Sequence, residues 1–226
     1  MELEMLFQDK ILKEYKEKFE AYRALILEYN QRYNLTTILE EKDMYYKHFL
    51  DSAAGVDMFL ENAKVAEIGS GAGFPSIVLK ILRKDLSFDL FESVGKKCEF
   101  LHVVVDKLGL ENVHIYNIRA EDAARDKNYR ERYDHATARA VARMNTLSEY
   151  CLPFVKVGGT FIAFKGDVLE EANEAQNAVK TLGGIVDNID YYQLDGAKRA
   201  LVYIKKIKNT PAKYPRGNGK ERKSPL

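Results

Sequence analysis

The amino-acid sequence predicts an α/β fold with a mostly parallel sheet, an antiparallel hairpin at one sheet edge and a helical N-terminal extension. Three observations predict it. Strand and helix patterns alternate from residue 63 onward, a glycine-rich turn joins the first strand to the first helix, and two late apolar strands are separated only by Asp195-Gly196. Alternation at this spacing is typical of a parallel sheet with helices on both faces.

The sequence divides into three predicted parts: a helical extension at 1–60, a central α/β domain at 61–208 and a basic tail at 209–226. Apolar residues recur every three or four positions across 6–30, from Phe7 and Ile11 onward, which predicts an amphipathic helix packed on the domain.

Residues after this helix predict a second one. Asn34 to Thr37 break the apolar pattern, and Thr36 or Thr37 is expected to cap a helix that carries His48 and Asp51. These two side chains lie three positions apart and so share a helix face. A structural pair is the favoured interpretation, and a contact with substrate is the second.

The central part predicts five parallel strands, each followed by a helix. The expected strands are 63–68, 86–92, 112–118, 133–139 and 158–165. The expected helices are 74–83, 96–108, 120–127, 144–152 and 167–182. Strands at 185–193 and 199–207 then form the edge hairpin.

The glycine-rich turn is the first candidate site. Gly69, Gly71 and Gly73 alternate directly after an apolar strand, and Glu67 precedes them. Glycine permits positive φ and lets a ligand approach the backbone. Dinucleotide folds use G-x-G-x-x-G, whereas Phe74 stands here where the last glycine would fall. The spacing resembles motif I of the class I S-adenosylmethionine (SAM)-dependent methyltransferases, which have a Rossmann-like sheet.

The next strand ends in a second candidate. Glu92 follows the apolar run 86–91, where a carboxylate can accept hydrogen bonds from both ribose hydroxyls. Dinucleotides and SAM both carry a ribose, so Glu92 does not discriminate between them. The glycine spacing does.

Composition excludes several classes of protein. The chain has 226 residues and a net charge of +1, with no apolar run of membrane-spanning length and no signal-peptide pattern at its acidic start. Two cysteines make no disulfide framework, so a cytoplasmic location is expected. The four histidines show no metal-ligand spacing, and no metal is predicted.

The tail is strongly basic. Lys213 and Arg216 flank Tyr214, and Lys or Arg side chains neutralise phosphates while tyrosine stacks on bases. A solvated basic tail is the bland alternative, but two prolines and the tyrosine favour a shaped segment that contacts nucleic acid.

Several motifs, in order along nearly the whole chain, resemble the bacterial small-subunit (16S) ribosomal RNA guanine-N7 methyltransferases, the glucose-inhibited division protein B family. The matching segments are Tyr33 to Thr36, His48 with Asp51-Ser52, Glu67 to Pro75, Glu92-Ser93 with Lys96-Lys97 and Phe100-Leu101, Arg119 to Glu121, Thr137 to Ala142, Gly158-Gly159 with Lys165-Gly166, and Thr210-Pro211 with Lys213 to Arg216. Glu92 stands where many members carry Asp, which keeps the carboxylate.

This resemblance implies a SAM-dependent rRNA methyltransferase that acts on 16S ribosomal RNA or the small subunit. We expect the protein to be a monomer. The resemblance implies contacts to SAM from Glu67, Gly69, Gly71, Gly73, Phe74, Glu92, Ser93, Ala120, Glu121 and Arg139. Arg139 is also the expected catalytic residue, facing the donor or the target base. The expected substrate contacts are Asn34, His48, Lys165, Arg199, Lys213, Tyr214 and Arg216.

The chemistry of the acceptor constrains these roles. N7 of guanine carries a free lone pair at neutral pH, so no general base is needed, and alignment and electrostatics carry the reaction. A donor aimed at N7 would block it, so Arg139 is expected to hold O6 only. Lys165 is expected as a phosphate or O6 contact, or as a structural residue. Two alternatives stay open: a nicotinamide-dependent oxidoreductase and a non-catalytic RNA-binding ribosome assembly factor.

Overall fold

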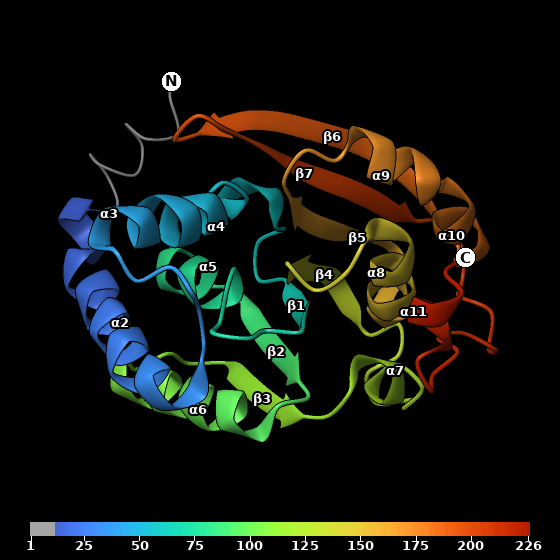
Figure 1. Ribbon diagram of the computed structural model, residues 1–226. Helices are drawn as coiled ribbons and strands as arrows, with labels where there is room; N and C mark the ends of the chain where they lie inside the picture. The colour runs from blue at the N-terminus through green and yellow to red at the C-terminus, as the bar shows by residue number, and fades with distance from the viewer. Residues whose placement is uncertain (1–11) are drawn as a thin grey trace.

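The computed structural model describes residues 12–226 and is organised around a seven-stranded sheet with the strand order β3-β2-β1-β4-β5-β7-β6 (Figure 1). The strands are β1 (Lys64–Ile68), β2 (Ser87–Glu92), β3 (Val113–Asn117), β4 (Tyr133–Arg139), β5 (Val155–Lys165), β6 (Gly184–Leu194) and β7 (Ala197–Lys206). The first five pair in parallel, and β7 runs antiparallel to both of its neighbours. The predicted parallel sheet with an antiparallel edge hairpin is therefore confirmed.

The strand register brings the carboxyl ends of the central strands to one edge of the sheet. Ile68 lies opposite Phe91, Glu92 lies opposite Asn117, and Arg139 lies opposite Phe164. Residues that follow these strands consequently gather at one place, where open α/β sheets bind ligands.

Helices cover both faces of the sheet (Figure 1). The N-terminal helices with α5 and α6 share one apolar core with the sheet, and α8, α9 and α10 share another. The helices of the central part are α5 (Ser76–Leu82), α6 (Gly95–Lys107), α7 (Ala120–Ala123), α8 (Met144–Cys151), α9 (Leu169–Glu174) and α10 (Gln176–Thr181). The predicted helix at 120–127 is shorter than expected, and the one at 167–182 divides at Ala175.

The extension forms helix α2 (Leu12–Tyr33), which confirms the amphipathic helix within the described residues. Its stripe of Phe19, Tyr22 and Ile26 is fully buried in the first core. Phe7 and Ile11, and the predicted start of the helix at residue 6, lie outside the described residues. The extension is thus continuous with the core of the domain that it covers.

The predicted cap at Thr36 or Thr37 is wrong. The next helix, α3 (Glu41–Met44), begins after Glu40, and a π-helical segment η2 (Tyr45–Leu50) and α4 (Asp51–Ala53) continue it. The Thr36 hydroxyl is used elsewhere, because it accepts the Ile38 N–H at 3.1 Å and contacts His48 Nε2 at 2.8 Å.

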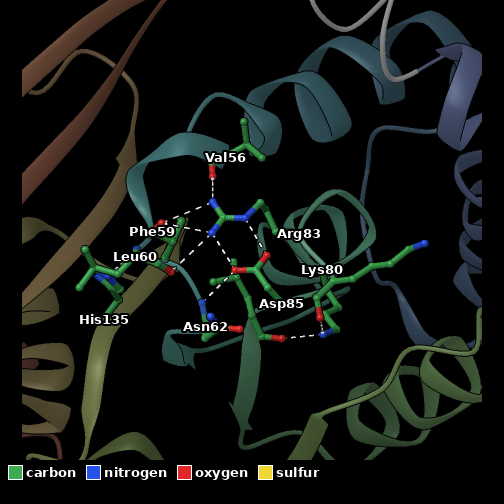
Figure 2. A network of polar contacts seen from close by, with 10 residues as sticks. Val56, Phe59, Leu60, Asn62, Lys80, Arg83, Asp85 and His135 are labelled. Atoms are coloured by element: carbon green, nitrogen blue, oxygen red, sulfur yellow. Dashed lines mark hydrogen bonds and ion pairs between the residues drawn. The ribbon is translucent and has the colours of Figure 1, made fainter.

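Figure 2 shows how the segment after α4 is fastened to the sheet. The Arg83 guanidinium, just after α5, donates to the Val56 carbonyl at 3.0 Å and pairs with both Asp85 oxygens at 2.8 Å. That pairing holds the pKa of Asp85 well below its ordinary value. At the neighbouring turn, Leu60 N–H donates to buried His135 Nε2 at 3.2 Å. These polar contacts are structural and lie away from the glycine turn.

The C-terminal segment (207–226) is packed against the domain and ends in α11 (Lys220–Lys223). Arg130 donates to the carbonyls of Thr210 and Tyr214, both at 2.8 Å. Arg216 forms a two-pronged pair with Glu149, whose side chain is fully buried. Two ordered anchors therefore fix the segment in place.

Three further features concern the described part of the chain. Cys98 and Cys151 are buried and unpaired by disulfides. Across residues 12–226, no group of three or more His, Cys, Asp or Glu side chains is arranged to hold a metal ion. No helix within that range combines the length and the apolar character needed to cross a bilayer.

Candidate functional site

A cavity opens at the carboxyl ends of β1 to β4, and we call it the strand-end cavity. Its walls come from the ends of these strands, from helix α8 and from the C-terminal segment. They include Gly69, Ser93, Ala120, Glu121, Val141, Tyr150, Glu221 and Arg222. The cavity thus lies where the strand register places it, and it recruits residues from the far end of the sequence.

The glycine turn approaches this cavity in a conformation that requires glycine. Gly69, Gly71 and Gly73 all have positive φ, at +68°, +58° and +94°. A Cβ on Gly69 would lie 2.8 Å from Val141, and one on Gly73 would lie 2.5 Å from Ile77. Side chains at these two positions would therefore collide with their neighbours.

Helix α2 supports the turn from below. The Tyr22 hydroxyl donates to the Ala72 carbonyl, and the Tyr22 ring packs on Phe74 at 5.4 Å between centroids. Burial raises the pKa of Tyr22 well above its ordinary value, so the hydroxyl stays a donor. The extension therefore fixes the shape of the ligand-facing turn.

Glu92 joins the turn to the end of β2. Its two carboxylate oxygens accept the N–H groups of Gly71 at 2.9 Å and Val94 at 2.8 Å. The Glu92 side chain is buried, and Asn117 and Cys98 hold its carbonyl. Each carboxylate oxygen has a second lone pair, so Glu92 retains capacity to accept hydroxyl donors.

Glu67 lies beneath the turn and is fully buried. The Ser76 hydroxyl donates to its Oε2, while Oε1 has no hydrogen-bond partner within the described residues. Burial raises the pKa of Glu67 to about 8. Glu67 is thus largely protonated at neutral pH and supports the turn from inside the core.

A second cavity lies on the other side of the strand β4 terminus, and we call it the Arg139 cavity. Charged and polar side chains dominate its wall: Lys47, His48, Asp51, Arg139, Lys165, Glu171 and Arg199. Arg139 donates to the Lys47 carbonyl at 3.0 Å and to Asp51 Oδ2 at 2.9 Å. Its guanidinium also lies over the Phe74 ring, 4.8 Å from the centroid.

His48 completes the shell around Arg139. Arg139 Nη2 lies 3.0 Å from His48 Nδ1, and His48 Nε2 lies 2.8 Å from the Thr36 hydroxyl. Since a guanidinium only donates, Nδ1 is the acceptor and Nε2 carries the proton. Burial and the nearby Arg139 charge lower the pKa of His48 to about 3, which agrees with a neutral ring.

The turn after β4 separates the two cavities. Ala140 lines the Arg139 cavity and Val141 lines the strand-end cavity. Ala140 has a φ of +57°, a strained conformation for a residue with a Cβ. Such strain costs on the order of 1–3 kcal/mol and concentrates at functional sites. Here it places consecutive side chains in different cavities.

The predicted site residues divide into three groups. Gly69, Ser93, Ala120 and Glu121 meet in the strand-end cavity, with Gly71 and Glu92 bonded at its edge. Arg139, His48, Lys165 and Arg199 meet in the Arg139 cavity. The remaining seven lie outside both walls: Asn34, Glu67, Gly73, Phe74, Lys213, Tyr214 and Arg216.

Most of this last group have structural partners. Phe74 is buried between the His48 ring and other aromatic side chains. Tyr214 is 6% exposed and cannot stack on a base in this arrangement, and Arg216 is paired with Glu149. Asn34 and Lys213 are exposed.

Sequence reasoning missed several residues of the site. Tyr192 donates to Asp51 Oδ1 at 2.9 Å, and Glu171 accepts from Lys165 at 2.7 Å. Tyr150, Glu221 and Arg222 line the strand-end cavity. Tyr22 looks like one more apolar position of its helix, and Glu221 carries no motif at all, so only the tertiary structure reveals them.

The strand-end cavity has the chemistry that a nucleoside ligand such as SAM needs. Carboxylate oxygens of Glu92 and Glu121 offer acceptors for hydroxyl and amino groups. Glu221 Oε2 is a buried acceptor without a partner among the described residues. Apolar contacts come from Ile68, Phe91 and Ile118. These residues therefore fit SAM.

Comparison with protein families matches residues 15–202 to the family described as GidB, rRNA small subunit methyltransferase G. Relatives agree with it. The ribosomal RNA small subunit methyltransferase G of Clostridium perfringens is 45% identical over 215 residues, covering 93% of this chain and 90% of the relative. That of Lactobacillus acidophilus is 45% identical over 218 residues, covering 93% and 91%.

Solved structures show the same fold at low sequence identity. TYW2 of M. jannaschii in complex with AdoMet superimposes with a TM-score of 0.59 at 13% identity, covering 76% of this chain and 80% of that one. The precorrin-6y C5,15-methyltransferase of Geobacter metallireducens gives a TM-score of 0.53 at 12% identity, covering 68% and 87%.

The sheet order, the antiparallel edge and these matches support the methyltransferase among the predicted functions. The nicotinamide-dependent oxidoreductase and the non-catalytic assembly factor are not retained. This protein is a SAM-dependent methyltransferase with a Rossmann-like class I fold, and its substrate is ribosomal RNA of the small subunit. The chain belongs to the rRNA small subunit methyltransferase G family.

Proposed function

We propose that this protein methylates N7 of a guanine in 16S ribosomal RNA, with the strand-end cavity holding SAM and the Arg139 cavity receiving the base. The observation that carries the proposal is the turn after β4, which lines one cavity with Ala140 and the other with Val141. Two sites separated by a single turn suit a transfer between two bound molecules, because such transfers depend on holding the reactants in contact.

The residues at the strand-end cavity have distinct roles in this proposal. Glu92 accepts from the ribose, Gly69 lets the ligand approach the backbone, and Ser93, Ala120 and Glu121 border the adenine. SAM supplies the methyl group when it is bound. The chain's own contribution is the fixed shape of the turn, which Tyr22 and Glu67 hold from below.

The Arg139 cavity suits an acceptor that needs no deprotonation. Its histidine is neutral but both ring nitrogens are already engaged, by Arg139 and Thr36. Asp51 is engaged by Arg139 and Tyr192. None of these groups is available as a general base, and N7 of guanine requires none. Arg139 and Arg199 instead offer donors for the base oxygen O6 and for phosphate.

The decisive experiment uses methyl-labelled SAM and small ribosomal subunits that lack N7-methylguanine, followed by chemical cleavage at N7-methylated sites. Label at one guanine would support both the acceptor atom and the substrate. Label at another base or atom, with SAM binding intact, would refute the N7 assignment and keep the family.

We predict that Arg139→Ala lowers methyl transfer about 10²–10³-fold, the usual effect of removing one electrostatic contact at a reaction centre. RNA affinity should fall far less, because phosphate contacts elsewhere dominate it. Steady-state turnover and filter binding measure the two effects. Parallel losses of turnover and RNA affinity would contradict a role at the reaction centre. The matched control is Arg143→Ala, at the exposed N-cap residue of α8 four positions further along the chain.

We further propose that the protein works in the cytoplasm, where its ribosomal RNA substrate is assembled, and that it works as a monomer. Light scattering after size-exclusion chromatography measures the mass directly. A mass of twice the 25.9 kDa of the chain would refute the monomer.

A further inference from the structure

The C-terminal segment does more than pack on the domain, because it forms one wall of the strand-end cavity. Gly219, Glu221 and Arg222 line the cavity together with Tyr150 of α8. The turn after β3, with Ala120 and Glu121, lines the same cavity. Residues about 100 positions apart therefore meet at the place where SAM is expected.

Glu221 is the unusual member of this wall. Its side chain is 1% exposed, and the Tyr150 hydroxyl donates to its Oε1 at 2.9 Å. Its Oε2 is buried as well but has no hydrogen-bond partner within residues 12–226. A buried carboxylate oxygen without a donor is costly, since its lost hydration is not replaced.

The backbone around Glu221 holds this carboxylate in place. The Thr146 hydroxyl donates to the Glu221 carbonyl at 2.9 Å, and Arg222 Nε donates to the Tyr150 hydroxyl at 3.1 Å. Tyr150 thus links the two residues of α11 to α8. The orientation of the free oxygen is consequently fixed by contacts that do not use it.

A nucleoside supplies what Glu221 lacks. SAM carries an amino group on its adenine and two hydroxyl groups on its ribose, all of them donors to a carboxylate. We propose that Glu221 is a SAM-recognition residue, whose Oε2 accepts a hydrogen bond from the adenosine part of the bound SAM. The inference rests on SAM occupying the strand-end cavity, as proposed above.

This assignment has a consequence for the segment itself. A hydrogen bond between SAM and α11 adds a contact that holds the segment on the domain. Because binding linkage is reciprocal, bound SAM should slow local opening of residues 217–224, and a firmly docked segment should bind SAM more tightly.

The experiment compares full-length Glu221→Gln with the unaltered chain by isothermal titration with S-adenosylhomocysteine and, separately, with adenosine. Glu221→Gln keeps the shape and an acceptor for Tyr150 but removes the charge. We expect both ligands to bind about 10–100-fold more weakly, the range for losing a hydrogen bond to a charged group. Glu170→Gln, an exposed site with the same charge change, should bind as the unaltered chain does.

Thr146→Val separates recognition from anchoring. It removes a bond to the Glu221 carbonyl but leaves the carboxylate, and Thr146 does not line the cavity. We expect its affinity for S-adenosylhomocysteine to stay within about twofold of normal. Hydrogen exchange of residues 217–224 should slow on ligand addition in the unaltered chain and in Thr146→Val, but not in Glu221→Gln.

Three results would overturn the inference. Normal affinity in Glu221→Gln would remove the contact. An equal loss in Thr146→Val would make Glu221 an anchor only, and a loss confined to S-adenosylhomocysteine would move the contact to the amino-acid part. If the unaltered chain bound neither ligand, the assignment of the strand-end cavity to SAM would fail as well, which is a distinguishable outcome.

Discussion

The N-terminal helices and the C-terminal segment both reach the site, but different forces hold them. The N-terminal helices are held by aromatic packing, since Phe19, Tyr22 and Phe49 are fully buried. The C-terminal segment is held by hydrogen bonds and ion pairs, above all Arg130 to backbone carbonyls and Arg216 to Glu149. Tyr22 links the aromatic packing of the N-terminal helices to the glycine turn, whereas buried polar anchors hold the C-terminal segment at the strand-end cavity.

The largest expected loss of stability comes from removing Asp51, a buried acidic side chain among the N-terminal helices. It tests whether packing alone holds these helices. Asp51 is 4% exposed and lies between Arg139 and Arg199. We predict that Asp51→Ala lowers the free energy of unfolding by about 3–5 kcal/mol, because the arginines lose their buried counter-charge. Urea denaturation measures it, with exposed Asp57→Ala as the control, expected within about 0.5 kcal/mol. Equal losses in the two variants would show that packing alone holds this end.

The next largest expected effect on stability comes from Glu67, which lies beneath the glycine turn, and this effect depends on pH. The pKa of Glu67 is raised by burial to about 8, so folding favours its protonated form. Its stabilising contribution is full below the unfolded pKa and is lost as pH rises through about 8.

We therefore predict that Glu67→Gln, which mimics the protonated side chain, gains stability relative to the unaltered chain between pH 5 and pH 8. The gain should be roughly 3 kcal/mol, at 1.36 kcal/mol per pKa unit. Urea unfolding at both pH values measures it. A difference that does not change with pH would mean that Glu67 stays ionised in the folded protein.

Substitutions in the glycine turn test whether Tyr22 of helix α2 holds that turn rigidly. A Cβ on Gly73 would lie 2.8 Å from the Tyr22 hydroxyl, whereas one on Gly71 has nothing nearer than 3.9 Å. We predict that Gly73→Ala costs about 2–3 kcal/mol and Gly71→Ala about 1, since both have positive φ but only one is overpacked. Thermal unfolding compares the pair. Similar losses would mean that helix α2 yields easily and does not hold the turn rigidly.

The smallest effect concerns the C-terminal segment. Lys213 is exposed, unlike its neighbours Tyr214 and Arg216, so it is free to meet phosphate. We predict that Lys213→Ala changes stability by less than about 0.5 kcal/mol and lowers the slope of log affinity for rRNA against log salt by about 0.7–0.9. Binding titrations at several salt concentrations test it against Lys16→Ala on the outer face of α2. An unchanged slope would make this segment purely structural.

Local sequence patterns predicted the fold, because the apolar periodicity of a strand or helix depends only on residues that are close together in the sequence. The five parallel strands and the hairpin turn at Asp195-Gly196 lie where the pattern places them, and both turn residues have positive φ. The Thr36 cap failed because its hydroxyl is recruited by His48, twelve positions away. The helix-capping preference of threonine considers only neighbouring residues, so it cannot take account of a distant partner such as His48.

The candidate site was predicted only in part. Glycine spacing and strand ends located Gly69 and Glu92, since these depend on the sheet alone, and the family resemblance pointed to Arg139. The role of Glu149 in pairing Arg216, and that of Glu221 in lining a cavity, depend on how the C-terminal segment folds back. The prolines and the tyrosine predicted a shaped segment that contacts nucleic acid, whereas Tyr214 packs into the second apolar core and Arg130 holds its carbonyl.

The neutral ring of His48 makes it a built-in spectroscopic reporter. With Nδ1 accepting from Arg139 and Nε2 engaged by Thr36, its imidazole resonances should not titrate across the physiological range. A base that draws the Arg139 guanidinium away frees Nδ1 and removes the positive charge that depresses protonation. The nitrogen chemical shifts of one residue would then record, in solution, the moment at which the acceptor enters.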